Sequence, residues 1–488
     1  MNTYRAAQIV WRGLLLCFCL GWATGALAQA DAPHQVLIVA PDSPYPTIAA
    51  ALVAAQPGDT IEVHGGQHAA PVVVEKSVAL VGVDNPVIDG QGSGSLVIIT
   101  APDTRFAGFT LRHSGDSLNH EDTGIVAQAD NVTVADNTLE DILFGIYFAN
   151  ADSGIARNNT VRCFNRELGL RGDGIRVWYS TNVLLDGNTV SLCRDTLVWY
   201  AENITVENNY IHDSRYGLHV MYSSHATMQH NRFEGNSIGS YLMYSQHLTM
   251  TQNRMVGNRG PSGYGIAFKE MDYATVSDNL IVGNRAGIYI DNSPALIDVN
   301  NSITGNFLAY NDSGISALPD TARNILESNT FLENLQQVTV LGRGNLLKNT
   351  WGTANGGNYW SDYVGYDGDG DGVGDTPYRA EKLFESLSDD NPVLRLFAFS
   401  PASQAIDFAA SAFPSLRPDP KVIEDHPMMH YTLPAGLDSP VRTVSLPFLA
   451  ASLALVAGGC VICLSALRGR FRRPARVKDA VQTSRAQA

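Results

Sequence analysis

A repeating unit of about 22 residues constrains the fold of this chain more than any other feature. Between about residues 100 and 350, each unit opens with an asparagine followed by a polar and then an apolar residue. Successive units are 20 to 29 residues apart. The opening asparagines are Asn137, Asn159, Asn188, Asn209, Asn231, Asn253, Asn279, Asn301, Asn329 and Asn349. Each unit holds two or three short runs of alternating apolar and polar residues, which is the pattern of strands with one buried face.

Corners of asparagine and glycine separate these runs. Asparagine tolerates left-handed backbone, and its amide can bond to the equivalent amide one coil above. A second asparagine column falls at Asn236, Asn258, Asn284, Asn306 and Asn334. The sequence therefore predicts an all-β fold, a right-handed parallel β-helix over residues 66–350. A propeller would need roughly 40 residues per blade, and a leucine-rich repeat would place leucine at fixed offsets, so neither pattern fits.

A solenoid of this kind needs caps over its open ends. A helix-like apolar run at 46–56 precedes a strand at 61–63, so residues 31–65 are expected to form an N-terminal cap helix and first strand. After Asn349 the repeat stops, and helix-like apolar spacing returns near Leu383 and from 402 to 413. We therefore expect a C-terminal capping segment with short helices at 351–417. A proline-rich linker should follow at 418–445.

Both termini carry targeting or membrane signals. Residues 1–28 combine basic residues, an apolar run and a small-residue cleavage site, which predicts a secretory signal peptide. Residues 446–467 hold no charge and would span about 33 Å as a helix, enough to cross a bilayer. The tail at 468–488 is basic, so the positive-inside rule places it in the cytoplasm. We expect a periplasmic body anchored to the inner membrane by one C-terminal transmembrane helix.

Charge and cysteine content fit an exported protein. The chain has 33 Lys and Arg against 48 Asp and Glu, a formal charge of −15, so nucleic-acid binding is not expected because phosphates require basic residues. Outside the signal and the apolar span, only Cys163 and Cys193 remain. They occupy equivalent positions on neighbouring repeats, so they could form a disulfide in an oxidising compartment.

Aligning the units by their asparagines predicts columns of outward side chains. One column is Trp178, Trp199, Met221, Met243 and Lys269, and the column beside it is Arg176, Leu197, His219, Tyr241, Ala267 and Tyr289. His225 is expected to stack on His247, and Met228 on Met250. We expect a docking face for a protein partner, made by Trp178, Trp199, His219, Met221, Tyr241, Met243, His225 and His247.

Methionine and histidine are unevenly distributed along the repeat. Six of the nine Met and five of the twelve His lie between His212 and Met271. Thioether and imidazole ligands suit a soft ion such as Cu(I), and Met also suits adaptable protein surfaces. Metal contact is thus the second interpretation of this face. The alternative is that some of these side chains fill the interior of the coils.

Two further motifs suggest metal binding. Two His and two Met within the predicted linker (His426, Met428, Met429 and His430) could bind copper, because no core is expected there for them to pack into. Alternating carboxylates at Asp367, Asp369, Asp371 and Asp375 suit a hard cation such as structural calcium. The second motif matches the start of an EF-hand loop, but Tyr378 replaces the closing glutamate, so a solvated acidic turn is the alternative.

Catalytic motifs are weak in this sequence. Asp and Glu are scattered singly, mostly before corner asparagines such as Asp136 and Asp186, whereas a glycosidase needs a pair of carboxylates on one face. No cluster of Arg or Lys with carboxylates is evident. The residues by themselves therefore make only a weak case for an active site.

The C-terminal part of the chain carries a further recognisable pattern. The text Gly357-Asn-Tyr-Trp-Ser-Asp-Tyr363, the acidic loop after it, and the stretches 383–387, 390–397 and 400–414 resemble the NosD family of exported β-helix proteins. The resemblance covers roughly residues 35 to 420. It implies an accessory protein, not an enzyme, that works with the permease and ATPase of an ABC transporter and with a copper chaperone lipoprotein. These proteins assemble the copper site of nitrous oxide reductase, with transient copper and with energy supplied by the ATPase.

The fold alone leaves a second class of function open. β-Helices also include polysaccharide-binding and polysaccharide-cleaving proteins. A groove of clustered carboxylates in the structure would favour that alternative.

Overall fold

The computed structural model describes residues 34–436, apart from Asp320, Asn355 and Phe399, and also residues 452 and 454–459. The chain divides into two units, Met1–Leu437 and Asp438–Ala488, and the second is described only as a short helical stretch. In the described residues, no helix is long and apolar enough to cross a membrane. The signal at 1–28 and most of the apolar span at 446–467 lie outside the described residues.

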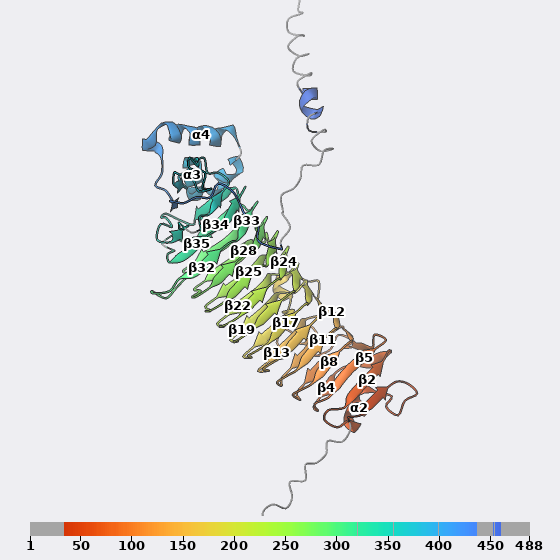
Figure 1. Ribbon diagram of the computed structural model, residues 1–488. Coiled ribbons are helices and arrows are strands. Elements are labelled where there is room, and N and C mark those ends of the chain that lie inside the picture. Colours follow the sequence, from red (N-terminus) through yellow and green to blue (C-terminus); the bar gives the residue numbers. More distant parts are fainter. Residues whose placement is uncertain are drawn as a thin grey trace, which may run out of the picture. The chain divides into compact units, whose positions relative to one another are not determined.

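The first unit is a parallel β-helix in which each coil contributes one strand to each of three sheets (Figure 1). Strands in one sheet pair only with the equivalent strands one coil before and one coil after, always in parallel. For example, β22 (Tyr216–Met221) pairs with β25 (Ile238–Met243), and Met221 lies opposite Met243. This arrangement confirms the all-β parallel β-helix predicted from the repeat.

Sheet A has 14 strands. They are β1 (Val36–Val39), β2 (Thr60–His64), β5 (Ala79–Val83), β8 (Arg105–Ala107), β11 (Thr133–Ala135), β14 (Ile155–Arg157), β17 (Leu184–Asp186), β20 (Thr205–Glu207), β23 (Thr227–Gln229), β26 (Thr249–Thr251), β29 (Thr275–Ser277), β32 (Asn301–Thr304), β35 (Asn324–Glu327) and β38 (Thr350–Trp351).

Sheet B has 13 strands. They are β3 (Gln67–Ala69), β6 (Val87–Asp89), β9 (Thr110–Arg112), β12 (Thr138–Ile142), β15 (Thr160–Cys163), β18 (Thr189–Ser191), β21 (Tyr210–His212), β24 (Arg232–Glu234), β27 (Arg254–Val256), β30 (Leu280–Val282), β33 (Phe307–Ala309), β36 (Thr330–Leu332) and β39 (Tyr359–Trp360).

Sheet C has 12 strands and carries the outward columns predicted from the repeat. Besides β22 and β25, they are β4 (Val72–Val74), β7 (Val97–Ile99), β10 (Thr123–Ala127), β13 (Phe144–Ala149), β16 (Ile175–Trp178), β19 (Asp195–Trp199), β28 (Tyr264–Lys269), β31 (Ala286–Asp291), β34 (Ser313–Ala317) and β37 (Gln336–Val340).

Buried asparagines form continuous hydrogen-bonded ladders along the solenoid. At most steps the backbone N–H and the side-chain Nδ2 of one Asn both donate to the Oδ1 of the Asn one coil further on. Asn231 donates in this way to Asn253 with both distances at 3.0 Å. At Asn236 only the backbone N–H donates to Asn258, and at Asn301 only Nδ2 donates to Asn324. Each ladder satisfies buried polar groups at the corners, where the backbone turns and cannot pair within a sheet.

The ladders differ from the sequence alignment after Asn279. The first ladder is Asn137, Asn159, Asn188, Asn209, Asn231, Asn253, Asn279, Asn306, Asn329 and Asn358. The second is Asn236, Asn258, Asn284, Asn311 and Asn334, and a third holds Asn301, Asn324 and Asn349. The prediction that Asn301 and Asn349 continue the first ladder was therefore wrong. The coil that follows Asn279 is longer, and strand pairing rather than a constant residue count selects the partner.

The N-terminal end of the solenoid is covered by α2 (Ile48–Ala54), within the apolar run at 46–56 (Figure 1). Thr47 caps the helix because its hydroxyl accepts a hydrogen bond from the N–H of Ala50 at 3.1 Å. Ile48 and Ala51 lie on the buried face of this helix. An additional strand, β1, precedes the helix and pairs with β2.

The C-terminal end closes later than expected. Strands β38 and β39 continue the coils to Trp360, beyond the boundary at residue 350. The cap then contains α3 (Leu383–Asp390), the 3₁₀ helix η2 (Pro392–Phe397), α4 (Pro401–Ala412) and the 3₁₀ helix η3 (Pro414–Leu416). Strands β40 (Tyr378–Arg379) and β41 (Ile423–Glu424) pair in antiparallel fashion beside it.

The segment at 421–432 is packed against this end, so the expectation that a linker begins at 418 was wrong. Val422 is fully buried, and Glu424 is 1% exposed. The Glu424 carboxylate accepts hydrogen bonds from the Asn358 N–H, the Asn358 amide and the Trp360 indole at 2.6, 3.0 and 2.7 Å. Glu424 thus completes the first asparagine ladder in place of a further Asn.

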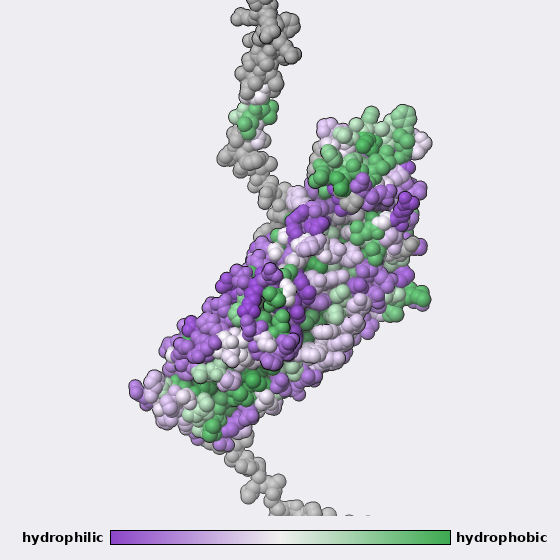
Figure 2. Space-filling view, turned by 180° about the vertical axis from the view of Figure 1, so that it is seen from behind, coloured by the Kyte–Doolittle hydropathy of each residue, from purple (hydrophilic) through white to green (hydrophobic). Residues whose placement is uncertain are grey.

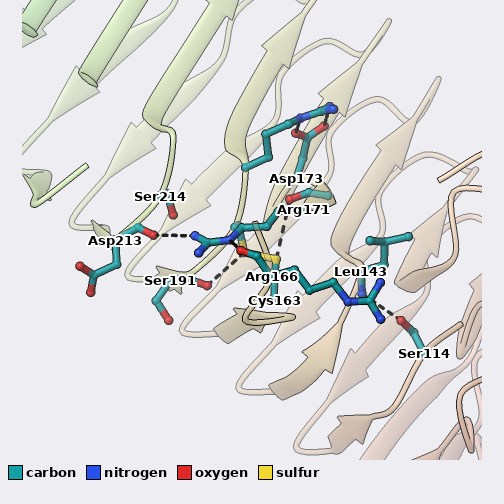
Figure 3. The surroundings of a disulfide bond; sticks show 12 residues. Ser114, Leu143, Cys163, Arg166, Arg171, Asp173, Ser191, Asp213 and Ser214 are labelled. Carbon is teal, nitrogen blue, oxygen red and sulfur yellow. Dashed lines mark hydrogen bonds and ion pairs between the residues drawn. A yellow bond between two sulfur atoms is a disulfide. The ribbon is translucent and has the colours of Figure 1, made fainter. Parts of the chain in front are cut away.

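Cys163 and Cys193 form a disulfide between neighbouring coils, with their Cα atoms 5.0 Å apart. The bond lies at the base of a loop that contains the 3₁₀ helix η1 (Leu168–Leu170) (Figure 3). Arg171 of this loop donates to the backbone carbonyl of Asp213 at 3.1 Å. The disulfide and this contact hold the loop against the side of the solenoid.

Candidate functional site

The outer face of sheet C places the predicted aromatic and thioether residues in one row. Parallel register sets Trp178 opposite Trp199, Trp199 opposite Met221, and Met221 opposite Met243. The two indole rings are stacked with centroids 6.1 Å apart. The four side chains are half-buried, so they present a continuous apolar strip on the surface.

The neighbouring row on the same face contains His219 and Tyr241. Register places them opposite each other, and their rings lie 6.2 Å apart. Tyr216 meets the His219 ring edge-on at 5.1 Å. His219 Nε2 lies 3.2 Å from the sulfur of Met243 in the first row. The two rows therefore meet at a histidine–thioether contact.

A ladder of exposed and half-buried tyrosines borders this face and was missed in the sequence. Tyr179, Tyr200, Tyr222 and Tyr244 each follow directly after the residue in the Trp/Met row. Their rings stack at 4.8, 5.1 and 5.0 Å. The signal was present as tyrosines separated by 21, 22 and 22 residues.

His225 and His247 lie at the next corner rather than on the outer face of sheet C. Their rings stack at 4.9 Å, as the alignment predicted, and Tyr273 continues the stack at 4.4 Å. His225 Nδ1 lies 3.5 Å from a carboxylate oxygen of Glu202. The structure therefore brings six of the eight predicted docking residues together and sets these two apart.

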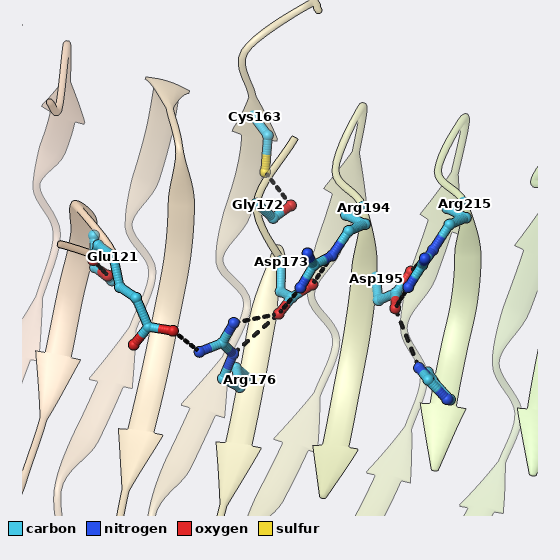
Figure 4. Close-up of polar contacts among 10 residues, drawn as sticks. Glu121, Cys163, Gly172, Asp173, Arg176, Arg194, Asp195 and Arg215 are labelled. Atoms are coloured by element: carbon cyan, nitrogen blue, oxygen red, sulfur yellow. Dashed lines mark hydrogen bonds and ion pairs between the residues drawn. The ribbon is translucent and has the colours of Figure 1, made fainter. Parts of the chain in front are cut away.

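A network of arginines and carboxylates lies beside the rows on sheet C (Figure 4). The fully buried carboxylate of Asp173 accepts hydrogen bonds from Arg176 at 2.8 and 3.0 Å and from Arg194 at 3.0 Å. Arg176 also donates to Glu121 at 2.7 Å. Burial opposes the charge on Arg176, but the two carboxylates outweigh it and raise the pKa of the guanidinium.

Asp195 is the second buried acid of this network. It accepts hydrogen bonds from Arg215 Nε at 2.8 Å and from His219 Nδ1 at 3.1 Å. Burial alone would raise the pKa of Asp195, but the hydrogen bonds from His219 and Arg215 outweigh burial and hold the pKa below its ordinary value. Both buried acids are thus ion-paired, which leaves neither as a free carboxylate of the kind that cleavage of a polysaccharide requires.

The sequence analysis missed this network because the partners are one coil apart. Arg194 is 21 residues after Asp173, and Arg215 is 20 residues after Asp195. Both offsets are close to one repeat. They could therefore have identified the pairs in the sequence once each residue was assigned to a corner. The statement that no Arg–carboxylate cluster is evident was wrong.

Most of the methionines that cluster between His212 and Met271 lie in the core. Met228, Met250, Met255 and Met271 are fully buried inside the coils, and Met228 pairs in register with Met250 as predicted. Of the six Met between residues 212 and 271, only Met221 and Met243 reach the outer face. The interior interpretation therefore holds for four of them.

The His426–His430 segment is not free in a linker. The N–H of Met428 donates to the carbonyl of Asn358 at 2.9 Å, and the N–H of Met429 donates to Gly372 at 3.0 Å. His426 and His430 are exposed, whereas Met428 and Met429 are half-buried. The expectation that these residues have nothing to pack against was wrong, because the segment lies along the last coil and the acidic loop.

The acidic loop brings three of its four predicted ligands together. Carboxylate oxygens of Asp367, Asp369 and Asp371 lie within 4.8 Å of one another. Asp375 instead accepts a hydrogen bond from the N–H of Gly368 at 2.7 Å. Hydrogen bonds from the N–H groups of Gly372 and Gly370 lower the pKa of Asp367, so this carboxylate carries its charge readily.

The C-terminal cap exposes a group of large apolar side chains. Leu396 of η2 is 83% exposed, and Phe408 of α4 is 73% exposed. Val393, Phe397, Phe413 and Leu416 add to the same cap. Figure 2 shows this apolar surface at the end of the solenoid. Such a concentration is unusual for a free surface and indicates an interaction site.

Comparison with known proteins assigns the chain to a family. The family model described as "Periplasmic copper-binding protein (NosD)" matches residues 158–365. A curated relative, "Probable ABC transporter binding protein NosD" of Pseudomonas aeruginosa, is 30% identical over 392 residues, which is 77% of this chain and 89% of the relative. The chain belongs to the NosD family. A NosD of Stutzerimonas stutzeri with the same description is 32% identical over 129 residues, 26% of this chain and 29% of that protein.

Two solved structures show a partial likeness to this chain. The periplasmic alginate epimerase AlgG is 15% identical, with a TM-score of 0.41 over 58% of this chain and 77% of that one. A PL6 alginate lyase in complex with a trisaccharide is 13% identical, with a TM-score of 0.48 over 68% of this chain and 86% of that one. The family is described as periplasmic and copper-binding, and the curated relatives are named as binding proteins of an ABC transporter.

Proposed function

We propose that this chain is an exported accessory protein that binds an ABC transporter through the apolar end of its solenoid. The observation that carries the proposal is the group of exposed apolar side chains on η2, α4 and η3. It lies at one end of a rigid rod, so the coils can extend away from the transporter. The names of the curated relatives support a transporter as the partner.

The proposal extends to copper. Together with a copper chaperone lipoprotein, the transporter-bound chain would take part in assembling the copper site of nitrous oxide reductase. The Trp/Met rows of sheet C, remote in sequence from the apolar cap, would serve as the docking face for the chaperone or the reductase. In this scheme the chain is a scaffold, and the ATPase of the transporter supplies the energy.

A membrane anchor is part of the same proposal. The uncharged stretch at 446–467 would cross the inner membrane once, with the basic tail at 468–488 in the cytoplasm. Removal of the signal at 1–28 would leave the solenoid in the periplasm. Such an anchor would keep the chain at the membrane that holds the permease.

The docking proposal predicts that polar substitutions in the cap weaken transporter binding. The double variant Leu396→Ser/Phe408→Ser removes two exposed apolar anchors, and losing about 3 kcal/mol of contact energy lowers affinity roughly 100-fold. The measurement is copurification of the full chain with the permease and ATPase subunits of its host's transporter. Ile297→Ser is the matched control, because Ile297 is 80% exposed on a loop after β31. Equal losses for both variants would contradict the proposal.

For the acidic loop we propose weak binding of a structural calcium ion. Three aspartates within one loop suit a hard cation, but the missing closing glutamate predicts a dissociation constant on the order of 1 mM. Titration calorimetry of the full chain should show calcium binding that is lost in Asp369→Asn/Asp371→Asn. The control is Asp375→Asn, which removes an acid that the loop already uses in a hydrogen bond. Identical titrations of the wild type and the double variant would leave the loop as a solvated acidic turn.

A further inference from the structure

Four residues of β22 and β25 form a compact square on the outer face of sheet C. His219 and Met221 are two residues apart on β22, so both point outward, and they lie opposite Tyr241 and Met243 on β25. The contact of 3.2 Å between His219 Nε2 and Met243 Sδ runs diagonally across this square. The sulfur of Met243 and the imidazole are therefore aimed at each other.

The hydrogen bond that His219 donates to Asp195 determines which ring nitrogen carries the lone pair. The buried carboxylate accepts from His219 Nδ1 at 3.1 Å, which assigns the ring proton to Nδ1. In a neutral imidazole with its proton on Nδ1, Nε2 carries the lone pair and faces the thioether.

The surroundings fix the imidazole in this orientation. Tyr216 packs edge-on against the ring at 5.1 Å, and Tyr241 stacks with it at 6.2 Å. A carboxylate on one ring nitrogen is the usual support of a histidine that binds a metal through the other nitrogen, and here that other nitrogen faces the Met243 sulfur. The His219 side chain is only 12% exposed, so water competes poorly for Nε2.

We propose that His219 Nε2 and the sulfurs of Met243 and Met221 bind a single soft monovalent cation. Imidazole and thioether ligands select Cu(I) over hard cations such as calcium or magnesium. Met221 supplies the third ligand because it neighbours both other residues in the square. The choice of Cu(I) rests on the proposed function, whereas the ligand set rests on the geometry of sheet C.

The test is anaerobic titration of the full chain with Cu(I), in competition with a coloured Cu(I) chelator and under reducing conditions. The wild type should bind one Cu(I), and Met221→Leu/Met243→Leu should weaken binding at least about 100-fold, since leucine keeps the volume and removes the sulfur. His219→Asn should give a comparable loss. Ag(I), which does not change oxidation state here, should repeat the pattern.

The matched control is Met228→Leu/Met250→Leu, which removes two sulfurs that are buried inside the coils. It should retain full Cu(I) binding. Loss of binding in this control, or unchanged binding in Met221→Leu/Met243→Leu, would overturn the proposal, as would a wild type that binds no Cu(I). Thermal unfolding of each variant shows whether the fold is intact.

Transporter copurification separates this inference from the proposed function. If the chain binds the transporter but no Cu(I), the metal-site proposal is wrong and the docking proposal is retained. If the chain binds Cu(I) through His219 and Met243 but does not bind the transporter, the docking proposal is wrong and the metal-site proposal is retained. X-ray absorption of the Cu(I) form should show both nitrogen and sulfur neighbours, and sulfur should disappear in Met221→Leu/Met243→Leu.

Discussion

Replacing Asn253 with alanine should destabilise the solenoid by about 4 kcal/mol, which is near the upper end of single-residue effects. Asn253 is fully buried in the first asparagine ladder. Its Oδ1 accepts two hydrogen bonds from Asn231, and its Nδ2 donates to the carbonyl of Met228 at 2.9 Å and to Asn279 Oδ1 at 3.0 Å. Alanine leaves the buried donors of Asn231 and the carbonyl of Met228 without these partners.

Urea unfolding of the full chain, followed by tryptophan fluorescence, measures this effect. Asn119→Ala is the control, because Asn119 is an exposed asparagine with ordinary backbone geometry and should change stability by less than about 0.5 kcal/mol. Similar small losses in both variants would mean that the ladder is not the source of stability that its hydrogen bonds indicate.

The C-terminal segment should loosen as pH rises through neutrality. Burial raises the pKa of Glu424 to about 7, even though hydrogen bonds from Asn358 and Trp360 act in the opposite direction. The ordinary value is 4.5, so between these two pH values the folded state holds a proton that the unfolded state releases. The contribution to stability is complete below about pH 4.5 and is lost as pH approaches 7. Its size is about 3 kcal/mol.

Hydrogen exchange provides a local measurement of this loss. The amides of Lys421 and Met428 donate to Ala380 and Asn358, so both report on the packed segment. Their exchange free energy, measured on the full chain, should fall between pH 5 and pH 7.5. Glu424→Gln cannot ionise and should remove this dependence, while the exposed Glu75→Gln should retain it. A flat profile in the wild type would contradict the raised pKa.

The sequence was sufficient to predict the parallel β-helix because the pattern that defines each coil lies within one repeat. Each coil repeats the same order of alternating strands and asparagine corners, so the period alone indicates stacked parallel strands. The alignment also placed Trp178, Trp199, Met221 and Met243 in one row, as the strand register shows. The alignment was wrong after Asn279, because the next coil is longer and Asn306, rather than Asn301, continues the first ladder.

The candidate site was only partly accessible from the sequence. The alternation of strands indicates which side chains point outward, but it does not say which charged residues meet across coils. In the sequence, Asp195 is one of several acids that are scattered singly. In the structure, Arg215 and His219 both donate hydrogen bonds to its carboxylate. The sequence also could not show that four of the methionines near His219 are buried, because an apolar side chain suits either face of a coil.

Sequence alone thus determined the period, the sheet class and the rows of outward residues, since these depend on spacing along the chain. Tertiary structure alone decided the contacts between elements distant in the chain. The packing of Glu424 under Asn358, 66 residues away, has no periodic signal. Nor does the aim of His219 at Met243, since both contacts depend on side-chain rotamers and on how one coil is shifted over the next.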